Sequence, residues 1–315
     1  MRDLRIVFMG TPEFAVSTLD AIIANGFNVV GVITAPDKPA GRGRKLNESA
    51  VKLFALSKGI TVLQPTNLKN KNFVAQLKAL SANLQVVVAF RMLPKIVWKM
   101  PEFGTFNLHA SLLPNYRGAA PINWAIINGE TKTGVSTFFI DEKIDTGEMI
   151  LQTEVNISKT ENVGELHDKL MAIGSQLVVS TLNLIKENKA TTTPQVETKD
   201  IKTAHKLDKD NCYINWNNSV HNIYNQVRGL NPYPSAWCLL QNGKEELNVK
   251  VYEVEVIESK HNHAIGSLIV TKEELKVASK NGFVYLKEIK LPGKRKMDVK
   301  SLLNGFIFDA NAKML

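Results

Sequence analysis

The first part of the chain alternates short, almost wholly apolar runs with stretches in which apolar residues recur at helical spacing. A continuous apolar run is typical of a strand buried on both faces of a parallel sheet. Strands are expected at Leu4–Met9, Val29–Thr34, Val86–Phe90, Phe106–His109, Gly134–Ile140 and Met149–Ile157, and helices at Glu13–Asn25 and Val163–Lys186. The pattern therefore predicts an α/β domain with a Rossmann-like open parallel sheet over residues 1–187.

The pattern changes after a polar stretch. Residues 188–206, NKATTTPQVETKDIKTAHK, have no sustained apolar period, which is typical of a linker. Beyond them a helix is expected at Val220–Val227, and short strands are expected at Trp237–Leu240, Leu247–Val256, Gly266–Val270, Glu274–Val277 and Phe283–Ile289. Turns such as Asn242-Gly243 separate these strands. We therefore expect a small OB-like β-barrel domain over residues 207–315.

Composition excludes several classes of protein. The longest apolar runs, such as LQVVVAF at 84–90, fall short of the roughly 20 residues of a membrane span. The short apolar run near the N-terminus ends in a turn, unlike a signal peptide, so a cytoplasmic protein without membrane contact is expected. Cys212 and Cys238 are too few for a disulfide scaffold and lack metal-ligand spacing with histidine, so no metal is expected.

The net charge of +9 is spread unevenly along the chain. From Lys38 to Lys99 the sequence has twelve Lys or Arg residues and a single acidic residue, Glu48. A second basic group near the other end comprises Lys287, Lys290, Lys294, Arg295, Lys296 and Lys300. Such groups suit a nucleic-acid backbone, but a solvated surface has the same composition. Charge alone leaves both interpretations open.

Two short motifs point to chemistry that the rest of the chain does not support. The loop GTPEF at 10–14 stands where a dinucleotide fingerprint would stand, but it has one glycine, so a nicotinamide enzyme is disfavoured. The tripeptide Asp145-Thr146-Gly147 matches the aspartic-protease motif but occurs once, whereas that chemistry needs two carboxylates.

A third group of residues is more informative. Asn107 and His109 lie two apart at the end of an expected strand, so their side chains point to one face, near the carboxyl ends where open sheets bind ligands. Asp145 lies in a loop from which it could reach the histidine. An amide donor, an imidazole and a carboxylate together form a plausible device for acyl transfer.

The stretch from His109 to Pro121, HASLLPNYRGAAP, with Asn107 before it and Asp145-Thr-Gly after it, resembles the motif of the formyltransferases that use 10-formyltetrahydrofolate. Three further features resemble the members of that family that formylate the initiator methionyl-tRNA. They are GTPEFA at 10–15, the insertion PDKPAGRGRKL at 36–46, and a C-terminal barrel with NPYPSAW at 231–237. The resemblance covers essentially the whole chain.

The resemblance implies roles for individual residues. Asn107 and His109 would stabilise the oxygen of the tetrahedral intermediate, and Asp145 would hold His109 and help to manage protons. Ser111, Leu112, Leu113 and Pro114 would hold the folate. Contact with the tRNA would come from Arg42, Arg44 and Lys45 in the insertion and from Lys294, Arg295 and Lys296 in the barrel. No metal is implied, and a monomer that binds tRNA and releases tetrahydrofolate is expected.

Two points stay open at this stage. The same fold also serves formyltransferases that act on a nucleotide sugar or another small amine, although the insertion and the barrel disfavour these acceptors. Where the family often has a glycine after the strand at 86–90, this chain has Arg91-Met92, in a stretch that borders the folate pocket of the family.

Overall fold

The structure of the protein is a computed structural model, and it describes residues 1–40 and 45–315. The chain forms two compact units, neither of which is a single continuous segment. The first unit comprises residues 1–118, 133–155 and 168–203, and the second comprises residues 119–132, 156–167 and 204–315. Residues 119–132 and 156–167 thus belong to the second unit, although the domain expected from the sequence at 1–187 includes them.

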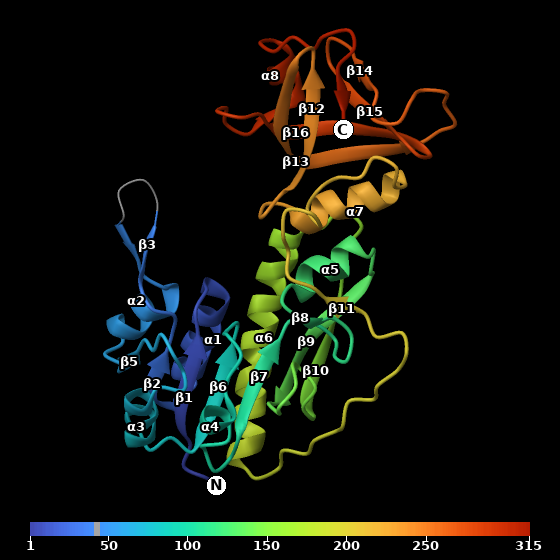
Figure 1. Ribbon diagram of the computed structural model, residues 1–315. Helices are drawn as coiled ribbons and strands as arrows, with labels where there is room; N and C mark the ends of the chain where they lie inside the picture. Colours follow the sequence, from blue (N-terminus) through green and yellow to red (C-terminus); the bar gives the residue numbers. More distant parts are fainter. Residues whose placement is uncertain (41–44) are drawn as a thin grey trace. The chain divides into compact units, whose positions relative to one another are not determined.

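The first unit is built on a seven-stranded sheet (Figure 1). Its strands, in spatial order, are β10 (Met149–Asn156), β9 (Lys132–Phe139), β7 (Thr105–His109), β6 (Leu84–Val88), β1 (Arg5–Gly10), β2 (Asn28–Ile33) and β5 (Val62–Leu63). The five strands from β7 to β5 pair in parallel, and β9 pairs antiparallel to β7. The apolar runs of β1 and β6 are almost wholly buried, as expected for strands covered on both faces.

Helices cover both faces of this sheet. On one face, α3 (Lys71–Ala79) and α4 (Lys95–Trp98) share a core with side chains from β1, β2 and β6. On the other face, Gly174 of α6 (Val163–Lys186) approaches so closely that an added Cβ would lie 2.9 Å from Leu108 in β7. Beside α6 lies α1 (Glu13–Ala24), since Ser175 hydrogen bonds with Ser17 and Thr18. The sheet is therefore the central layer of a three-layer unit.

A β-hairpin follows β2 and carries the insertion noted in the sequence. Its stems are β3 (Lys38–Ala40) and β4 (Lys45–Asn47), which pair antiparallel, and α2 (Ala50–Ser57) follows them. Lys52 of α2 hydrogen bonds with Asp37, directly before β3, and pairs with Glu48, directly after β4, at 2.7 Å. The hydrogen bond from Lys52 lowers the pKa of the Asp37 carboxyl from its ordinary value of 3.8. One partly exposed lysine thus joins both stems of the hairpin at its base.

The second unit is a nearly closed antiparallel sheet. Its main strands are β12 (Ala236–Asn242), β13 (Glu245–Glu258), β14 (Leu268–Val270), β15 (Leu275–Ser279), β16 (Gly282–Lys290) and β18 (Lys313–Met314). The short β18 pairs with β12 on one side, and on the other Met314 donates its N–H to Gly266 O at 2.8 Å. This arrangement confirms the OB-like barrel expected from the sequence.

Helices close the core of the second unit. One side of α7 (Val220–Leu230) is buried against the barrel, and Ser219 caps its first turn through the N–H of Asn222. The short α5 (Pro121–Ile127) packs on α7, where an added Cβ at Gly229 would lie 2.7 Å from Ile127. A further helix, α8 (Val299–Leu303), follows the two-residue strand β17 (Met297–Asp298).

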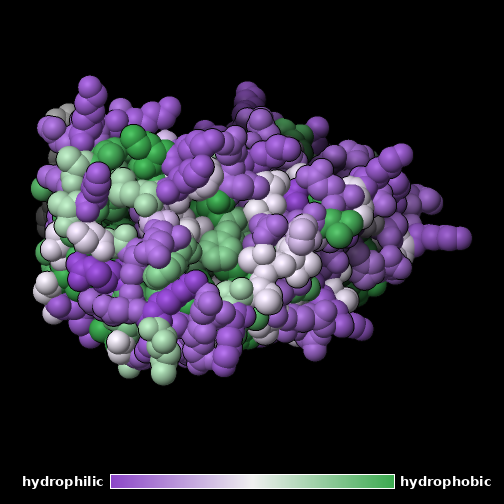
Figure 2. Space-filling view, turned by 90° about the horizontal axis from the view of Figure 1, so that it is seen from below, coloured by the Kyte–Doolittle hydropathy of each residue, from purple (hydrophilic) through white to green (hydrophobic). Residues whose placement is uncertain are grey.

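The expected helices and strands are confirmed within about two residues, except that the helix expected at Val220–Val227 continues to Leu230. The strand expected to reach Phe90 ends at Val88, because Ala89 adopts a positive φ of 48° that a strand cannot continue through. The stretch 188–206 has little regular structure beyond β11 (Thr203–Ala204) and a bridge between Thr193 and Met149. Among the residues that the structure describes, no helix combines the length and apolar character of a membrane span. In Figure 2 hydrophilic residues cover most of the face shown, with small hydrophobic patches between them.

Candidate active site

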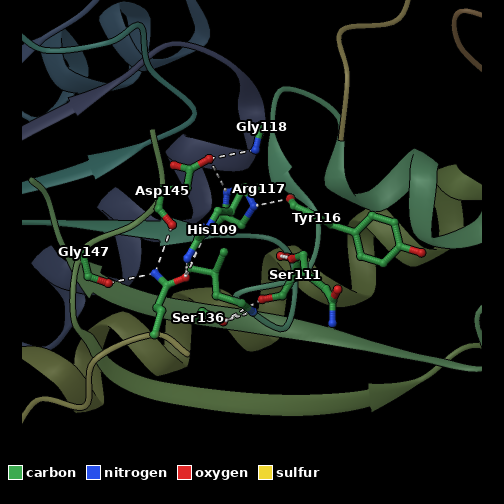
Figure 3. Close-up of polar contacts among 11 residues, drawn as sticks. His109, Ser111, Tyr116, Arg117, Gly118, Ser136, Asp145 and Gly147 are labelled. Atoms are coloured by element: carbon green, nitrogen blue, oxygen red, sulfur yellow. Dashed lines mark hydrogen bonds and ion pairs between the residues drawn. The ribbon is translucent and has the colours of Figure 1, made fainter. Parts of the chain in front are cut away.

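Strand β7 ends at His109, whose side chain is almost completely buried. The Nε2 atom of its ring lies 2.8 Å from the carbonyl oxygen of Tyr116 (Figure 3). Because a carbonyl oxygen can only accept a hydrogen bond, this contact places a proton on Nε2. In the neutral ring Nδ1 is then the atom with a lone pair, and it is the one that can accept a proton.

The carboxylate of Asp145 faces that free nitrogen. Its Oδ2 atom lies 3.8 Å from Nδ1 of His109 and accepts a hydrogen bond of 2.9 Å from the N–H of Gly118. Both side chains are well shielded, with 7% and 15% of their surfaces exposed. A proton taken up at Nδ1 would therefore create a cation beside a shielded carboxylate, where solvent weakens their attraction only partly. The structure thus brings together His109 and Asp145, as expected.

Asn107 occupies the same face of β7 as His109, because it lies two residues earlier on the strand. It pairs in register with Val87, a member of the core under α3 and α4. Its side chain is partly exposed and makes no hydrogen bond within the described ranges 1–40 and 45–315. The amide N–H groups of Asn107 are therefore available to a bound molecule.

The turn that carries Asp145 has a fixed shape. Asp145 itself has a positive φ of 55°, which is uncommon for a residue with a side chain. Earlier in the turn, Asp141 accepts hydrogen bonds from the N–H of Lys143 and the hydroxyl of Thr146. A Cβ added at Gly147 would lie 1.6 Å from Phe139 O, so only glycine fits there. The Asp-Thr-Gly tripeptide is thus explained by turn geometry and by the pairing of Asp145 with His109.

The loop from Ser111 to Pro114, expected to hold folate, is braced by neighbouring strands. Ser136 of β9 donates to the carbonyl of Ser111 at 2.6 Å and accepts from the N–H of Leu113 at 3.2 Å. Gln152 of β10 donates to the carbonyl of Leu113 at 3.1 Å. These main-chain groups already have partners, so a ligand would meet a rigid loop whose remaining polar groups are few. The role of Ser111, Leu112, Leu113 and Pro114 stays a prediction.

The residues expected to contact tRNA are placed only in part. Arg42 and Arg44 of the insertion lie outside the described residues, as does the side chain of Lys45. Lys294, Arg295 and Lys296 are exposed on the turn between β16 and β17. Lys296 pairs with Glu288 at 2.6 Å, whereas Lys294 and Arg295 form no ion pair with any other residue that the structure describes.

The departure at Arg91 has a structural counterpart. Its guanidinium donates to the carbonyl oxygens of Pro65 and Thr66, in the loop after β5. Arg91 therefore joins the loops that follow β5 and β6, at the same edge of the sheet as the end of β7.

Comparison with known proteins decides the family. The family model described as "Formyl transferase" matches residues 4–182, and the one described as "Formyl transferase, C-terminal domain" matches residues 206–307. The chain belongs to the formyltransferase family. A relative named methionyl-tRNA formyltransferase, from Flavobacterium johnsoniae, is 61% identical over 100% of both chains. Another of the same name, from Parabacteroides distasonis, is 52% identical and covers 96% of each chain.

A solved formyltransferase structure has the same fold. WlaRD, described as a sugar 3N-formyl transferase, superposes with a TM-score of 0.65 over 94% of this chain and 100% of its own. Its sequence identity is 18%, so this likeness concerns the fold alone. The motifs in the sequence predicted a formyltransferase, and the family models and the relatives confirm that prediction.

Some residues at the site could not be found from the sequence. Ser136 and Gln152 lie within strands, and Gln195 lies in the stretch expected as a linker. The side chain of Gln195 hydrogen bonds with the turn of Asp145 and with Arg117. Nothing in its neighbourhood, TTTPQVET, indicates a buried contact, because the segment has no apolar period. No group of three or more potential metal ligands occurs among residues 1–40 and 45–315.

Proposed function

We propose that the protein transfers the formyl group of 10-formyltetrahydrofolate to the free amino group of methionine on initiator methionyl-tRNA, for translation initiation. The observation that carries the proposal is identity of 61% over the full length to a relative that bears the name methionyl-tRNA formyltransferase. This likeness includes the insertion and the barrel, which a small acceptor does not require.

The pair of His109 and Asp145 supplies the proton chemistry in this proposal. An amine that attacks a formyl carbon must lose a proton, and Nδ1 of His109 is the atom able to take it. When the tetrahedral intermediate collapses, the bond between the formyl carbon and the folate nitrogen breaks, and the same proton passes to that nitrogen as tetrahydrofolate leaves. Asp145, 3.8 Å away, stabilises the resulting imidazolium. Because Tyr116 O keeps the other ring proton on Nε2, the ring cannot turn its lone pair away from Asp145 without losing a buried hydrogen bond.

Asn107 supplies the second contribution. Negative charge develops on the formyl oxygen when the amine adds, and a donor placed in advance lowers the free energy of that state. The amide of Asn107 has no hydrogen-bond partner among the described residues and lies on the face of β7 that His109 shares. It fits this role, and protonated Nδ1 of His109 is the further donor on the same side.

The substrates are assigned to two regions. The folate, which supplies the activated formyl group, is held by Ser111, Leu112, Leu113 and Pro114. The tRNA backbone is contacted by Arg42, Arg44 and Lys45 of the insertion and by Lys294, Arg295 and Lys296 of the barrel, and the last three are exposed. The domains at 1–187 and 207–315, with the linker at 188–206, divide these tasks, and the protein acts as a monomer in the cytoplasm.

A transfer assay tests the proposal directly. Labelled formyl from 10-formyltetrahydrofolate is followed onto initiator tRNA charged with methionine, with uncharged tRNA and an amino-sugar nucleotide as parallel acceptors. We expect label on the charged tRNA alone, because uncharged tRNA has no amino group of the kind that is formylated. Transfer to the amino-sugar nucleotide, without transfer to the charged tRNA, would instead establish the alternative of a small-amine formyltransferase.

A further inference from the structure

The segment expected as a linker contributes one residue to the site. Among residues 191–200, Gln195 is the only one that is partly buried, and the others are exposed. We infer that Gln195 is a positioning residue for formyl transfer, which holds the main chain of the Asp145 turn in the conformation that faces Asp145 toward His109. The inference rests on the proposed function of Asp145.

The contacts of the Gln195 amide nitrogen lie on both sides of Thr146. One N–H donates to Asp145 O at 3.0 Å and the other donates to Gly147 O at 2.8 Å. Both donors of the amide are therefore used, and both hold the main chain of the turn. A side chain that only fastened the 188–206 stretch to the surface would not need two hydrogen bonds to the main chain of the turn, one of them to Asp145 itself.

The amide oxygen of Gln195 is fixed by Arg117. It accepts hydrogen bonds from Nε of Arg117 at 3.1 Å and from Nη2 at 2.8 Å. Since guanidinium groups only donate and carbonyls only accept, these four contacts allow one orientation of the amide. The Arg117 side chain is 14% exposed, so its hydrogen bonds compete little with solvent.

The three residues 116–118 connect these contacts to the reacting groups. Tyr116 O accepts from His109, Gly118 N donates to Asp145, and Arg117 between them holds Gln195. Asp145 is thus held twice, through its carboxylate by Gly118 and through its carbonyl by Gln195. Gly118 belongs to this stretch, and Gln195 is held by Arg117 of the same stretch, so a shift of the turn would also alter the distance between Asp145 and His109.

The turn needs this support because of its backbone. A φ of 55° at Asp145 is less favourable than the common conformations, and such a conformation persists only where its surroundings hold it. Without the two hydrogen bonds of Gln195 the carbonyl of Asp145 is free to rotate, and the carboxylate then loses its place beside Nδ1. Small displacements of a functional group cost large factors in rate.

Two variants of Gln195 separate positioning from simple attachment. Gln195→Ala removes all four contacts, and we expect kcat to fall about tenfold while KM for both substrates changes less than about twofold. Gln195→Glu keeps the pairing with Arg117 but cannot donate to Asp145 O and Gly147 O, so we expect a loss of kcat at least as large. If Gln195 served only to fasten the segment to Arg117, Gln195→Glu would retain full activity.

The matched control is Glu197→Gln. Glu197 is 70% exposed and pairs with Arg117 at 3.4 Å, but no hydrogen bond joins it to the Asp145 turn. Its substitution should leave kcat and both KM values unchanged. Thermal unfolding of every variant is measured in parallel, and a Gln195 variant that fails to fold counts against the inference, because its role would then be structural.

A double-mutant cycle with Asp145→Asn completes the test. If Gln195 acts through Asp145, Gln195→Ala should change kcat less than about twofold in the Asp145→Asn background, although it costs about tenfold alone. Equal losses in both backgrounds, or a Gln195→Ala enzyme as active as the original, would overturn the inference. If Asp145→Asn alone keeps full activity, it is the proposed role of Asp145 that fails.

Discussion

At the scale of the residue, the site depends on which nitrogen of His109 carries the proton. The buried contact with Tyr116 O assigns that proton to Nε2, and Oδ2 of Asp145 lies 3.8 Å from the other nitrogen, Nδ1. The distance is too long for a hydrogen bond, so the pair is poised to respond when Nδ1 becomes charged. Asn107 adds a donor that no described residue uses. Nδ1 of His109 and the unused amide of Asn107 are therefore suited to a step that creates charge.

Removal of either group should reveal this dependence. For Asn107→Ala and His109→Ala we expect kcat to fall by about 10²-fold or more, because a preplaced donor and a general base each contribute factors of this size. The measurement is formyl transfer to charged initiator tRNA, with circular dichroism and thermal unfolding to verify the fold.

Asn25→Ala provides the matched control for that experiment. Asn25 is exposed directly after α1, and the one hydrogen bond of its side chain to another described residue goes to the carbonyl of Ala21 in that helix. Its substitution should leave transfer unchanged. Turnover at the original rate in Asn107→Ala or His109→Ala would remove that residue from the mechanism.

At the scale of the element, the β3–β4 hairpin is anchored by a single side chain. Lys52 is 15% exposed and joins Asp37 and Glu48, which flank the two stems. The Asp37 carboxyl has a pKa below its ordinary value of 3.8, so this contact stabilises the fold above about pH 4. The stabilisation is lost as the pH falls through the lowered pKa of the folded state. Lys52 of α2 therefore fixes the base of the hairpin, where the strands β3 and β4 begin and end.

Substitution of that lysine tests the hairpin as an element for tRNA use. For Lys52→Met we expect KM for charged tRNA to rise about threefold or more, because a loosened hairpin must be ordered on binding. KM for 10-formyltetrahydrofolate should stay unchanged. Lys58→Met is the control, since Lys58 lies in an exposed ion pair with Asp20 at 3.8 Å and over the ring of Phe54, and joins neither Asp37 nor Glu48. A KM for tRNA equal to that of the original enzyme would exclude the hairpin from tRNA binding.

The elements also show what a single sequence reveals. Strands such as β1 and β6 are predictable because burial on both faces demands continuous apolar runs. The pairing of Asp145 with His109 is suggested by the motif resemblance and not by the order of the strands, because β9 runs antiparallel to β7 and its carboxyl end lies at the opposite edge of the sheet from His109. The contacts of Gln195 are not predictable, because they join residues 50 and 78 positions apart through hydrogen bonds within a polar segment. The spacing of apolar residues along the sequence indicates which residues are buried, but it contains no information about hydrogen bonds between polar side chains.

At the scale of the whole molecule, the chain passes between its two compact units several times. Residues 119–132 and 156–167 precede the 188–206 stretch but belong to the unit of the barrel. Within that unit, Asn123 donates to Gly229 O at 2.8 Å, and Arg228 donates to Glu161 O at 2.8 Å. Arg228 is 9% exposed, so this second contact is buried.

Cleavage of the exposed stretch should therefore not separate the pieces. After limited proteolysis at Lys199, which is exposed, we expect two bands on a denaturing gel but one peak in gel filtration under native conditions. The contacts of α5 and of residues 156–167 with α7 hold the fragments together. Elution as two separate peaks without denaturant would show that these contacts are too weak to sustain the unit.

The same arrangement limits how the protein can be recombined. A chimaera that joins the first two hundred residues of one formyltransferase to the barrel of another would place the two sides of the α5–α7 contact in different parents. At that contact Ile127 meets Gly229 so closely that no Cβ fits between them. A functional exchange of barrels must therefore bring along residues 119–132 and 156–167 from the donor of the barrel.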